Sequence, residues 1–189
     1  PTFRHEAFEQ YKAQREETPE AIRLSVPIIK EIIRAYRIPI LEVAGYEADD
    51  VIGTLATEAG RQGIITYMMT PDKDYGQLVS DKVFMYRPKH TGGFEVMGVD
   101  EVKAKFDIQS PAQVIDMLGL MGDSSDNIPG CPGVGEKTAQ KLIAEFGSIE
   151  NLLEHTDQLK GALKTKVETN REMITFSKFL ATIKIDVPI

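Results

Sequence analysis

The stretch from residue 39 to residue 69 constrains the fold of this chain more than any other part of its sequence. Residues 39–43 and 64–69 are short apolar runs bounded by glycine and proline, which is typical of buried strands. Residues 46–62 between them have the length and spacing of a helix. A strand, a helix and a second strand joined in this way pair in parallel and form a sheet that further helices cover. The pattern therefore predicts an α/β core.

Other segments extend this prediction in both directions. A helical pattern covers residues 4–16, and a second helix begins after Thr18 and Pro19, with a kink expected at Pro27. Residues 83–87 and 94–97 flank a turn, residues 90–93, and predict a hairpin or the edge of a sheet. From Val99 onward the chain is predicted to be mostly helical, with helices over residues 112–121, between Gly135 and Gly147, and over residues 164–183.

The composition narrows the classes of protein and of site. With 189 residues and 42% apolar side chains, the chain can build one globular domain, or a domain with a small satellite. No apolar run approaches the ~20 residues of a membrane-spanning helix and no signal peptide is recognisable, so a soluble cytoplasmic protein is expected. Cys131 is the only cysteine and the three histidines are far apart, which excludes an internal disulfide and argues against a zinc site.

The net charge of −7 argues, taken by itself, against a nucleic-acid partner, because binding to phosphates normally requires an excess of lysine and arginine. Seven of the 29 acids fall in three compact clusters, and without them 22 acids would face 22 bases. The acidity can thus be assigned to one site, although other sets of seven acids would balance the charge equally well.

Three clusters of carboxylates lie at the ends of predicted elements: Glu47, Asp49 and Asp50; Asp72 and Asp74; and Asp123 and Asp126. The first cluster begins a helix, where helical spacing lets its members converge on one edge. The second follows the strand at residues 64–69, where α/β sheets place ligands, and its two members face the same way if strand geometry continues. The third lies in the loop after residues 112–121. Each cluster also has a purely structural explanation as a helix start, a solvated turn or a cap.

Together the clusters predict a metal site, because a sheet can bring all three to one rim. Unit charges ~4 Å apart repel by about 4 kcal/mol at an effective dielectric constant near 20, so the carboxylates need cations to stay ionised. Oxygen ligands alone favour Mg²⁺ or Mn²⁺, and two such ions stabilise the attacking and leaving oxygens of phosphoryl displacement. The implied reaction is hydrolysis of a phosphodiester.

A glycine-rich segment, residues 128–139, points to the substrate. Its glycines let the backbone approach a phosphate, and the free N–H groups at the start of the next helix bind anions. Candidate DNA contacts here are Gly133, Gly135, Lys137 and Thr138, with Lys141 extending a basic edge by one turn. The segment is neither a Rossmann fingerprint nor a P-loop, and a tight interhelical turn without a ligand is the alternative interpretation.

A further group of DNA contacts is expected near the N-terminus. Arg4, Lys12 and Arg15 supply cations, and Tyr11 supplies an aromatic ring on which a frayed base could stack. An amphipathic helix with a few bases on its solvent face explains the same residues equally well.

The whole chain closely resembles the 5′-3′ exonuclease (flap endonuclease) family, the nucleases fused to bacterial DNA polymerase I. The resemblance rests on an ordered series of motifs: Phe3-Arg4-His5-Glu6 with Tyr11-Lys12, Gly45-Tyr46-Glu47-Ala48-Asp49-Asp50, Asp72-Lys73-Asp74, Gly122-Asp123-Ser124-Ser125-Asp126-Asn127, and Gly133-Val134-Gly135-Glu136-Lys137-Thr138-Ala139. This series is highly specific in its order.

The resemblance implies a fold, a cofactor and a substrate. The fold is an α/β nuclease core with an N-terminal arch helix over residues 1–98, with a mainly parallel sheet flanked by helices, and a helical helix-hairpin-helix DNA-binding part over residues 99–189. The seven carboxylates would hold two Mg²⁺ or Mn²⁺ ions, and the glycine hairpin would grip duplex DNA with K⁺ as its candidate cation. Arg4, Lys12 and Arg15 would belong to the arch that guides the 5′ single strand. The substrates would be 5′ flaps and nicked or gapped duplexes, including RNA primers, next to a linked polymerase module.

The resemblance also leaves alternatives. Members of the family carry two further acidic ligands on strands that precede the first residue of this sequence, and without them weak or absent cleavage with residual DNA binding is expected. A non-catalytic DNA-binding module is therefore the first alternative to an enzyme. A related carboxylate-lined ribonuclease fold that acts on RNA is the second.

Overall fold

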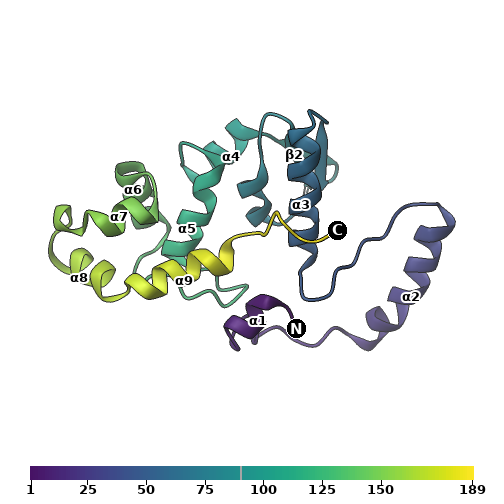
Figure 1. The fold of residues 1–189 in the computed structure, drawn as a ribbon, viewed down its shortest axis with the longest axis horizontal. Helices are drawn as coiled ribbons and strands as arrows, with labels where there is room; N and C mark the ends of the chain where they lie inside the picture. The colour runs from purple at the N-terminus through teal and green to yellow at the C-terminus, as the bar shows by residue number, and fades with distance from the viewer. Residues whose placement is uncertain (90) are drawn as a thin grey trace.

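The computed structural model describes residues 1–89 and 91–189, so His90 in the predicted turn lies outside the described residues. The helices and strands are, in chain order, α1 (Phe3–Ala7), α2 (Glu20–Ala35), α3 (Ala48–Arg61), β1 (Thr66–Met69), the 3₁₀ helix η1 (Lys73–Leu78), β2 (Val83–Pro88), β3 (Phe94–Met97), α4 (Val99–Phe106), η2 (Pro111–Gln113), α5 (Val114–Met121), α6 (Glu136–Phe146), α7 (Ile149–Glu154), η3 (Thr156–Gln158), α8 (Gly161–Thr169) and α9 (Arg171–Ala181). Figure 1 shows the strands and α3 beside a mostly helical part that contains α5 to α9.

A three-stranded sheet in the order β1-β2-β3 forms the α/β part. β1 pairs in parallel with β2, with Thr66 opposite Val83, and β2 pairs antiparallel with β3, with Met85 opposite Met97. The hairpin predicted from residues 83–87 and 94–97 is therefore confirmed. The sheet with its flanking helices also confirms the predicted α/β class.

The two faces of the sheet differ because successive side chains of a strand point in opposite directions. Met68, Val83, Met85 and Met97 are buried and join the core. The helix α3 lies close to the sheet at Gly60, where an added Cβ would come within 2.9 Å of a Val83 methyl carbon. The opposite face carries exposed side chains, among them those of Tyr67, Met69, Phe94 and Val96.

The strand predicted at residues 39–43 does not form. Within the described residues these positions are irregular, and Leu41 in the run is 48% exposed. An apolar run becomes a strand only where a neighbouring strand accepts its backbone hydrogen bonds, and no described strand lies beside this one. The parallel pairing instead joins β1 and β2 across η1.

Three helix predictions also need correction. The helix expected over residues 4–16 ends at Ala7, and the following residues turn back so that the Lys12 N–H donates to the Asp126 carbonyl. The helix expected over residues 164–183 is two helices, α8 and α9, separated at Asn170, whose side chain bonds back to the Lys166 carbonyl. The helix α2 continues through Pro27 without interruption.

The helical part follows the remaining predictions closely. Ser110 accepts a hydrogen bond from the Ala112 N–H and caps η2, which leads into α5. Gly135 precedes α6, and Gly147 ends it with a positive φ of 80°. Glycine tolerates this left-handed conformation because it has no Cβ.

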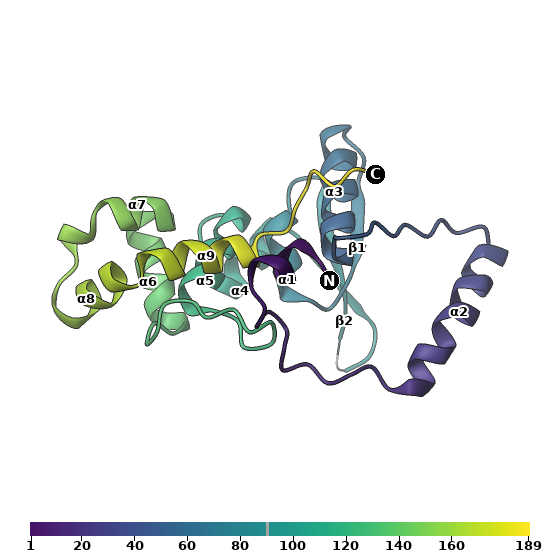
Figure 2. The same cartoon turned by 60° about the horizontal axis from the view of Figure 1, so that its bottom comes forward.

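The helix α2 stands apart from the rest of the molecule in both overall views (Figures 1 and 2), and none of its residues is buried. Four of its apolar side chains are more than half exposed: Ile22, Leu24, Ile28 and Ile32. Across the described residues, no helix has both the length and the apolar character that a bilayer-spanning segment requires.

Candidate metal site and nucleic-acid interface

The first acid cluster is compact. A carboxylate oxygen from each of Glu47, Asp49 and Asp50 lies within 4.8 Å of the others, as the helical spacing predicted. The three residues occupy the start of α3, where the exposed N–H groups of the helix favour negative charge. The hydrogen-bond partners of the three carboxylates differ, however, and these partners decide which of them can bind a metal ion.

Asp50 is fully buried and hydrogen-bonded on both oxygens. It accepts from two nitrogens of Arg4 at 2.8 Å, from the Lys184 N–H and from the Glu47 N–H. Burial works against its charge, yet the bonds from Arg4 and from the two backbone N–H groups lower its pKa. A carboxylate has about four acceptor sites, and all four are used here. We therefore correct the prediction for Asp50: it holds Arg4 in place and has no free site for a metal ion.

Arg4 is 1% exposed and uses all five of its donors. Besides Asp50, its guanidinium donates to Glu47 at 2.8 Å and to the carbonyl oxygens of Leu180 and Thr182. Burial disfavours its charge, but Asp50 keeps its pKa above the usual value. The prediction that Arg4 contacts DNA is wrong for this structure, because no donor remains for a phosphate.

Asp49 faces the site with an unused acceptor. Its Oδ1 is buried and has no hydrogen-bond partner among the described residues. Burial and the neighbouring charges of Glu47 and Asp50 raise the pKa of Asp49 to about 6. A buried carboxylate oxygen without a donor is costly, and a bound cation would remove that cost.

The second cluster lies where β1 ends, but strand geometry does not continue through it. Asp72 instead caps η1, and its Oδ1 accepts from the Asp74 N–H at 3.0 Å. Asp74 resembles Asp49, because its Oδ1 is buried without a hydrogen-bond partner and burial raises its pKa to about 6. The Lys73 ammonium lies 3.2 Å from that oxygen and opposes this rise.

The third cluster lies in the loop after α5. Asp123 accepts from the N–H and hydroxyl of Ser125 and from the Lys73 ammonium, and these bonds lower its pKa against the effect of burial. Asp126 lies 2.5 Å from Arg15 and 3.5 Å from Lys12. Its side chain is only 13% exposed.

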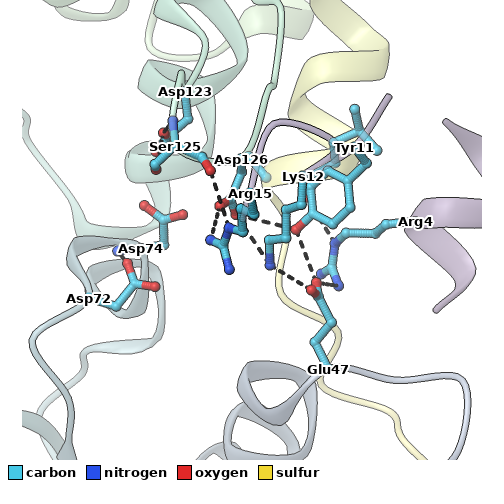
Figure 3. A network of polar contacts seen from close by, with 12 residues as sticks. Arg4, Tyr11, Lys12, Arg15, Glu47, Asp72, Asp74, Asp123, Ser125 and Asp126 are labelled. Carbon is cyan, nitrogen blue, oxygen red and sulfur yellow. Dashed lines mark hydrogen bonds and ion pairs between the residues drawn. The ribbon is translucent and has the colours of Figure 1, made fainter. Parts of the chain in front are cut away.

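Basic side chains bridge the clusters and show that they share one space. The Lys12 ammonium contacts Glu47 at 2.5 Å as well as Asp126, which joins the first cluster to the third. The Lys73 ammonium contacts Asp74 and Asp123, which joins the second to the third. Figure 3 shows Asp72 and Asp74 on one side of this space and Glu47 on another, with Lys12 and Arg15 between them. We call this space, with the three clusters around it, the acid site.

The acid site has the donor set of a divalent-cation site. Leaving out Asp50, the site has six carboxylates, and oxygen ligands are what Mg²⁺ and Mn²⁺ prefer. Among the described residues, the buried Oδ1 of Asp49 has no hydrogen-bond partner, and the buried Oδ1 of Asp74 is contacted by the Lys73 ammonium at 3.2 Å. The residues present therefore fit divalent metal ions.

The four predicted N-terminal DNA contacts differ in burial: Arg4 and Tyr11 are buried, whereas the side chains of Lys12 and Arg15 are partly exposed. Tyr11 is 3% exposed, and its hydroxyl donates to Glu47 at 3.0 Å and to Asp126 at 3.3 Å, so the predicted stacking on a base is wrong. Burial, followed by these two carboxylates, raises its pKa. Lys12 and Arg15 instead reach into the acid site, where a phosphate oxygen can replace a carboxylate as their partner.

The glycine hairpin, within residues 128–139, is closely packed at one glycine and exposed to solvent at others. Gly130 has a φ of 62°, and a Cβ there would lie 2.3 Å from the Gly122 nitrogen. Gly133 and Gly135 are exposed, as are Lys137 and Lys141 on α6, while Thr138 is half-buried. The two lysines border a cavity of about 300 Å³ together with Asp107 and Gln140. The hairpin is thus a tight interhelical turn that also presents a basic surface.

Sequence reasoning missed two residues of the acid site. Lys73 bridges two clusters, and Ser125 donates to Asp123. Both lie inside the acidic motifs already singled out. The position of Lys73 between two candidate ligands was a signal for this, because an ammonium so close in sequence to carboxylates can form an ion pair with them.

Two family models cover the chain almost completely. The first, described as the 5′-3′ exonuclease, N-terminal resolvase-like domain, matches residues 1–107, and the second, described as the 5′-3′ exonuclease, C-terminal SAM fold, matches residues 109–189. DNA polymerase I of Bacillus subtilis is 47% identical and the thermostable DNA polymerase I of Thermus thermophilus is 41% identical, each over 100% of this chain. The chain spans 22% of the length of these relatives.

Solved structures show a similar fold. The T5 5′-exonuclease with bound divalent metal ions (zinc) aligns with a TM-score of 0.79 at 23% identity, over 95% of this chain and 69% of that chain. The catalytic core of Rad2 in complex with DNA substrate aligns with a TM-score of 0.56 at 19% identity, over 90% of this chain and 56% of that one. At these identities the likeness is one of fold alone.

Proposed function

Because the chain belongs to the 5′-3′ exonuclease family, we propose that it is a structure-selective 5′ nuclease that hydrolyses phosphodiester bonds of DNA. The observation that carries this proposal is the acid site, in which carboxylates from three distant segments surround one space together with Lys12, Arg15 and Lys73. Carboxylates that gather in this way suit metal-assisted phosphoryl chemistry.

Six carboxylates would hold the metal ions: Glu47, Asp49, Asp72, Asp74, Asp123 and Asp126. We propose two Mg²⁺ or Mn²⁺ ions, which when bound supply a nucleophilic hydroxide and stabilise the charge of the leaving oxygen. Lys12 and Arg15 bind oxygens of the reacting strand and keep it against the carboxylates. Arg4 positions Glu47 through its guanidinium and the shared contact with Asp50.

The helical part would hold the duplex. Gly135 has open space where a Cβ would lie and leaves room for a phosphate at the start of α6, and the Lys166 ammonium lies beside Gly133. Lys137 and Lys141 supply charge one turn apart. We propose that Thr138 and a K⁺ ion at the hairpin assist this contact. We also propose the division of the chain into an α/β nuclease part, residues 1–98, and a helical DNA-binding part, residues 99–189.

The substrates we propose are duplexes with a 5′ flap, a nick or a gap, including those that carry RNA primers. Such substrates arise when a polymerase displaces the strand ahead of it, which agrees with relatives that are DNA polymerases. We expect a polymerase module in the same polypeptide and action on the nucleoid DNA of a bacterial cytoplasm.

Cleavage of a labelled 5′-flap duplex tests the proposal. The wild-type protein with Mg²⁺ should release the flap near the junction of single and double strand. Asp74→Asn should abolish turnover with little change in the Kd for DNA, because it removes a ligand and not a phosphate contact. Asp81→Asn, an equal change at an exposed carboxylate outside the acid site, should cleave normally.

Two outcomes would contradict it. If the wild-type protein binds the flap duplex but shows no metal-dependent cleavage, the chain is a DNA-binding module and not a nuclease. If single-stranded RNA competes better than the flap duplex and is cut faster, the ribonuclease alternative holds.

A further inference from the structure

A second charged cavity lies outside the acid site, between the sheet and α4. It has a volume of about 490 Å³ and is bordered by Arg87 from β2, Glu95 and Met97 from β3, and Glu101 and Lys105 from α4. We call it the Arg87–Lys105 pocket. None of the residues assigned to the acid site or to the glycine hairpin borders it.

Arg87 is poorly satisfied in this pocket. Its Nε is buried and has no hydrogen-bond partner among the described residues. One terminal nitrogen donates to the Met97 sulfur at 3.2 Å, which is a weak acceptor, and lies 3.8 Å from Glu95. A guanidinium normally finds oxygen acceptors for its fork of donors, and this one has a single distant carboxylate.

Lys105 adds a second positive charge to the same pocket. Partial burial, followed by the repulsion of Arg87, lowers the pKa of Lys105, and Glu95 opposes this change. Glu101 bonds to the backbone rather than to Arg87 or Lys105, because its carboxylate accepts from the Gly98 N–H at 2.8 Å at the start of α4. The pocket thus holds two cations with incomplete compensation, and an anion would relieve both the repulsion and the unused donor.

The position of the pocket indicates which anion would bind in it. The Thr70 N–H, two residues before Asp72, donates to the Tyr86 carbonyl at 3.2 Å, so the segment that leads to the second acid cluster lies beside the residue that precedes Arg87. At its other end, α4 meets α6, where Gln140 donates to the Phe106 carbonyl at 3.1 Å. Lys137 and Lys141 border the neighbouring cavity beside Asp107, directly after α4. The β2 side of the pocket is thus joined to the segment that leads to the second acid cluster, and its α4 side is joined to α6, which carries the lysines proposed to hold the duplex.

We propose that the Arg87–Lys105 pocket binds a backbone phosphate of the DNA substrate, at a point between the acid site and α6. The proposal rests on the proposed function for the choice of DNA as the ligand. Arg87 donates to the phosphate oxygens through the N–H groups of its guanidinium, and Lys105 adds a positive charge at the edge of the pocket. Binding there fixes the distance between the duplex contact and the acid site, so the pocket is a positioning site and takes no part in the chemistry.

The test measures the affinity of the protein for a 5′-flap duplex in EDTA, between 50 and 200 mM salt. Arg87→Met with Lys105→Met should raise the Kd roughly tenfold or more and make the slope of log K against log salt shallower by about 1 to 2. Lys105→Met alone should show a smaller effect of the same sign, and it perturbs folding less because Lys105 is exposed.

The matched control is Lys82→Met, which removes one charge immediately before β2, at the opposite end of the strand from Arg87. It should leave the Kd and the salt slope unchanged. If Lys105→Met and the double variant both match the wild type in Kd and slope, the pocket does not bind DNA, even where the wild type cleaves normally. If the wild type fails to cleave but both variants lose affinity, the pocket stands and the nuclease proposal fails.

Competition by inorganic phosphate separates a strand phosphate from a free anion. Millimolar phosphate should weaken DNA binding of the wild type equally with that of the Lys82→Met control. An effect of phosphate on thermal stability that needs Arg87 and Lys105, without any effect of the two substitutions on DNA affinity, would overturn the assignment to DNA.

Discussion

At the scale of the residue, two side chains that were predicted to contact DNA instead position the carboxylates of the acid site. Arg4 and Tyr11 were predicted to touch DNA, but both are buried and bind carboxylates. Arg4 alone connects α1, the start of α3 and the carbonyl groups at the end of α9. Charges placed in this way fix the direction of Glu47 before any metal ion or substrate arrives.

Arg4→Met should lower the free energy of unfolding by about 3 to 5 kcal/mol, because it leaves the fully buried Asp50 without its main partner. Urea unfolding at pH 7.5 measures the change. Arg61→Met is the matched control, since Arg61 is 64% exposed and its nearest carboxylate is 3.9 Å away. A loss below 1 kcal/mol for Arg4→Met would mean that the Arg4–Asp50 pair is not a structural anchor.

The raised pKa of Asp74 predicts an unusual dependence of stability on pH. Because its folded-state value of about 6 lies above the ordinary 3.8, its contribution to stability is full below pH 3.8 and is lost as the pH rises through 6. Without divalent metal at pH 8, Asp74→Asn should therefore stabilise the protein by roughly 2 to 3 kcal/mol, and the gain should vanish near pH 4.

Added Mg²⁺ at pH 8 should narrow this difference in stability by about 1.4 kcal/mol or more, since the wild type binds the ion at least about tenfold more tightly than Asp74→Asn. Chemical unfolding at the two pH values, with and without Mg²⁺, gives all four comparisons. Asp81→Asn should show neither effect, because Asp81 is exposed. An Asp74→Asn protein that is less stable than the wild type at pH 8 in EDTA would contradict the assignment of Asp74 as a carboxylate whose burial costs more than its contact with Lys73 restores.

At the scale of the element, the hairpin between α5 and α6 combines a rigid half and an open half. Gly130 packs against Gly122 at the end of α5, and its N–H donates to the Ser177 hydroxyl of α9. Gly135 has an extended backbone and open space where a Cβ would lie. Gly130 is therefore required for close packing, whereas Gly135 keeps the space before α6 open.

Gly130→Ala should destabilise the protein by about 2 kcal/mol or more, because alanine meets both a left-handed φ and the Gly122 backbone. Gly135→Ala should change stability by less than about 0.5 kcal/mol, although it narrows the proposed approach of a phosphate. Thermal unfolding of the two variants side by side checks the difference. Equal stability would show that the hairpin does not depend on close packing at Gly130.

At the scale of the whole molecule, the sequence predicted which residues gather but not how they are held. Periodicity identified α3, β1, the β2–β3 hairpin and most of the helices after Val99, because each follows from local spacing and capping. The three acid clusters were found because each lies beside such an element. These are properties that neighbouring residues determine by themselves.

The errors arose where distant partners decide the outcome. Residues 39–43 have the apolar run of a strand but no described strand pairs with them, and the helix after Phe3 stops where the chain turns toward Asp126. The burial of Arg4 depends on Asp50 and on carbonyl groups 176 and 178 residues away in the sequence. Single-sequence patterns contain no information about such contacts.

Titration with Mn²⁺ of variants that remove one carboxylate from each cluster is the most direct measurement of whether the clusters act as one site. Asp49→Asn, Asp74→Asn and Asp126→Asn should each weaken Mn²⁺ binding about tenfold or more and stop cleavage of a 5′-flap duplex. Asp81→Asn should do neither. If any one of the three leaves both the Mn²⁺ affinity and the cleavage rate unchanged, that cluster lies outside the metal site and a single shared site is contradicted.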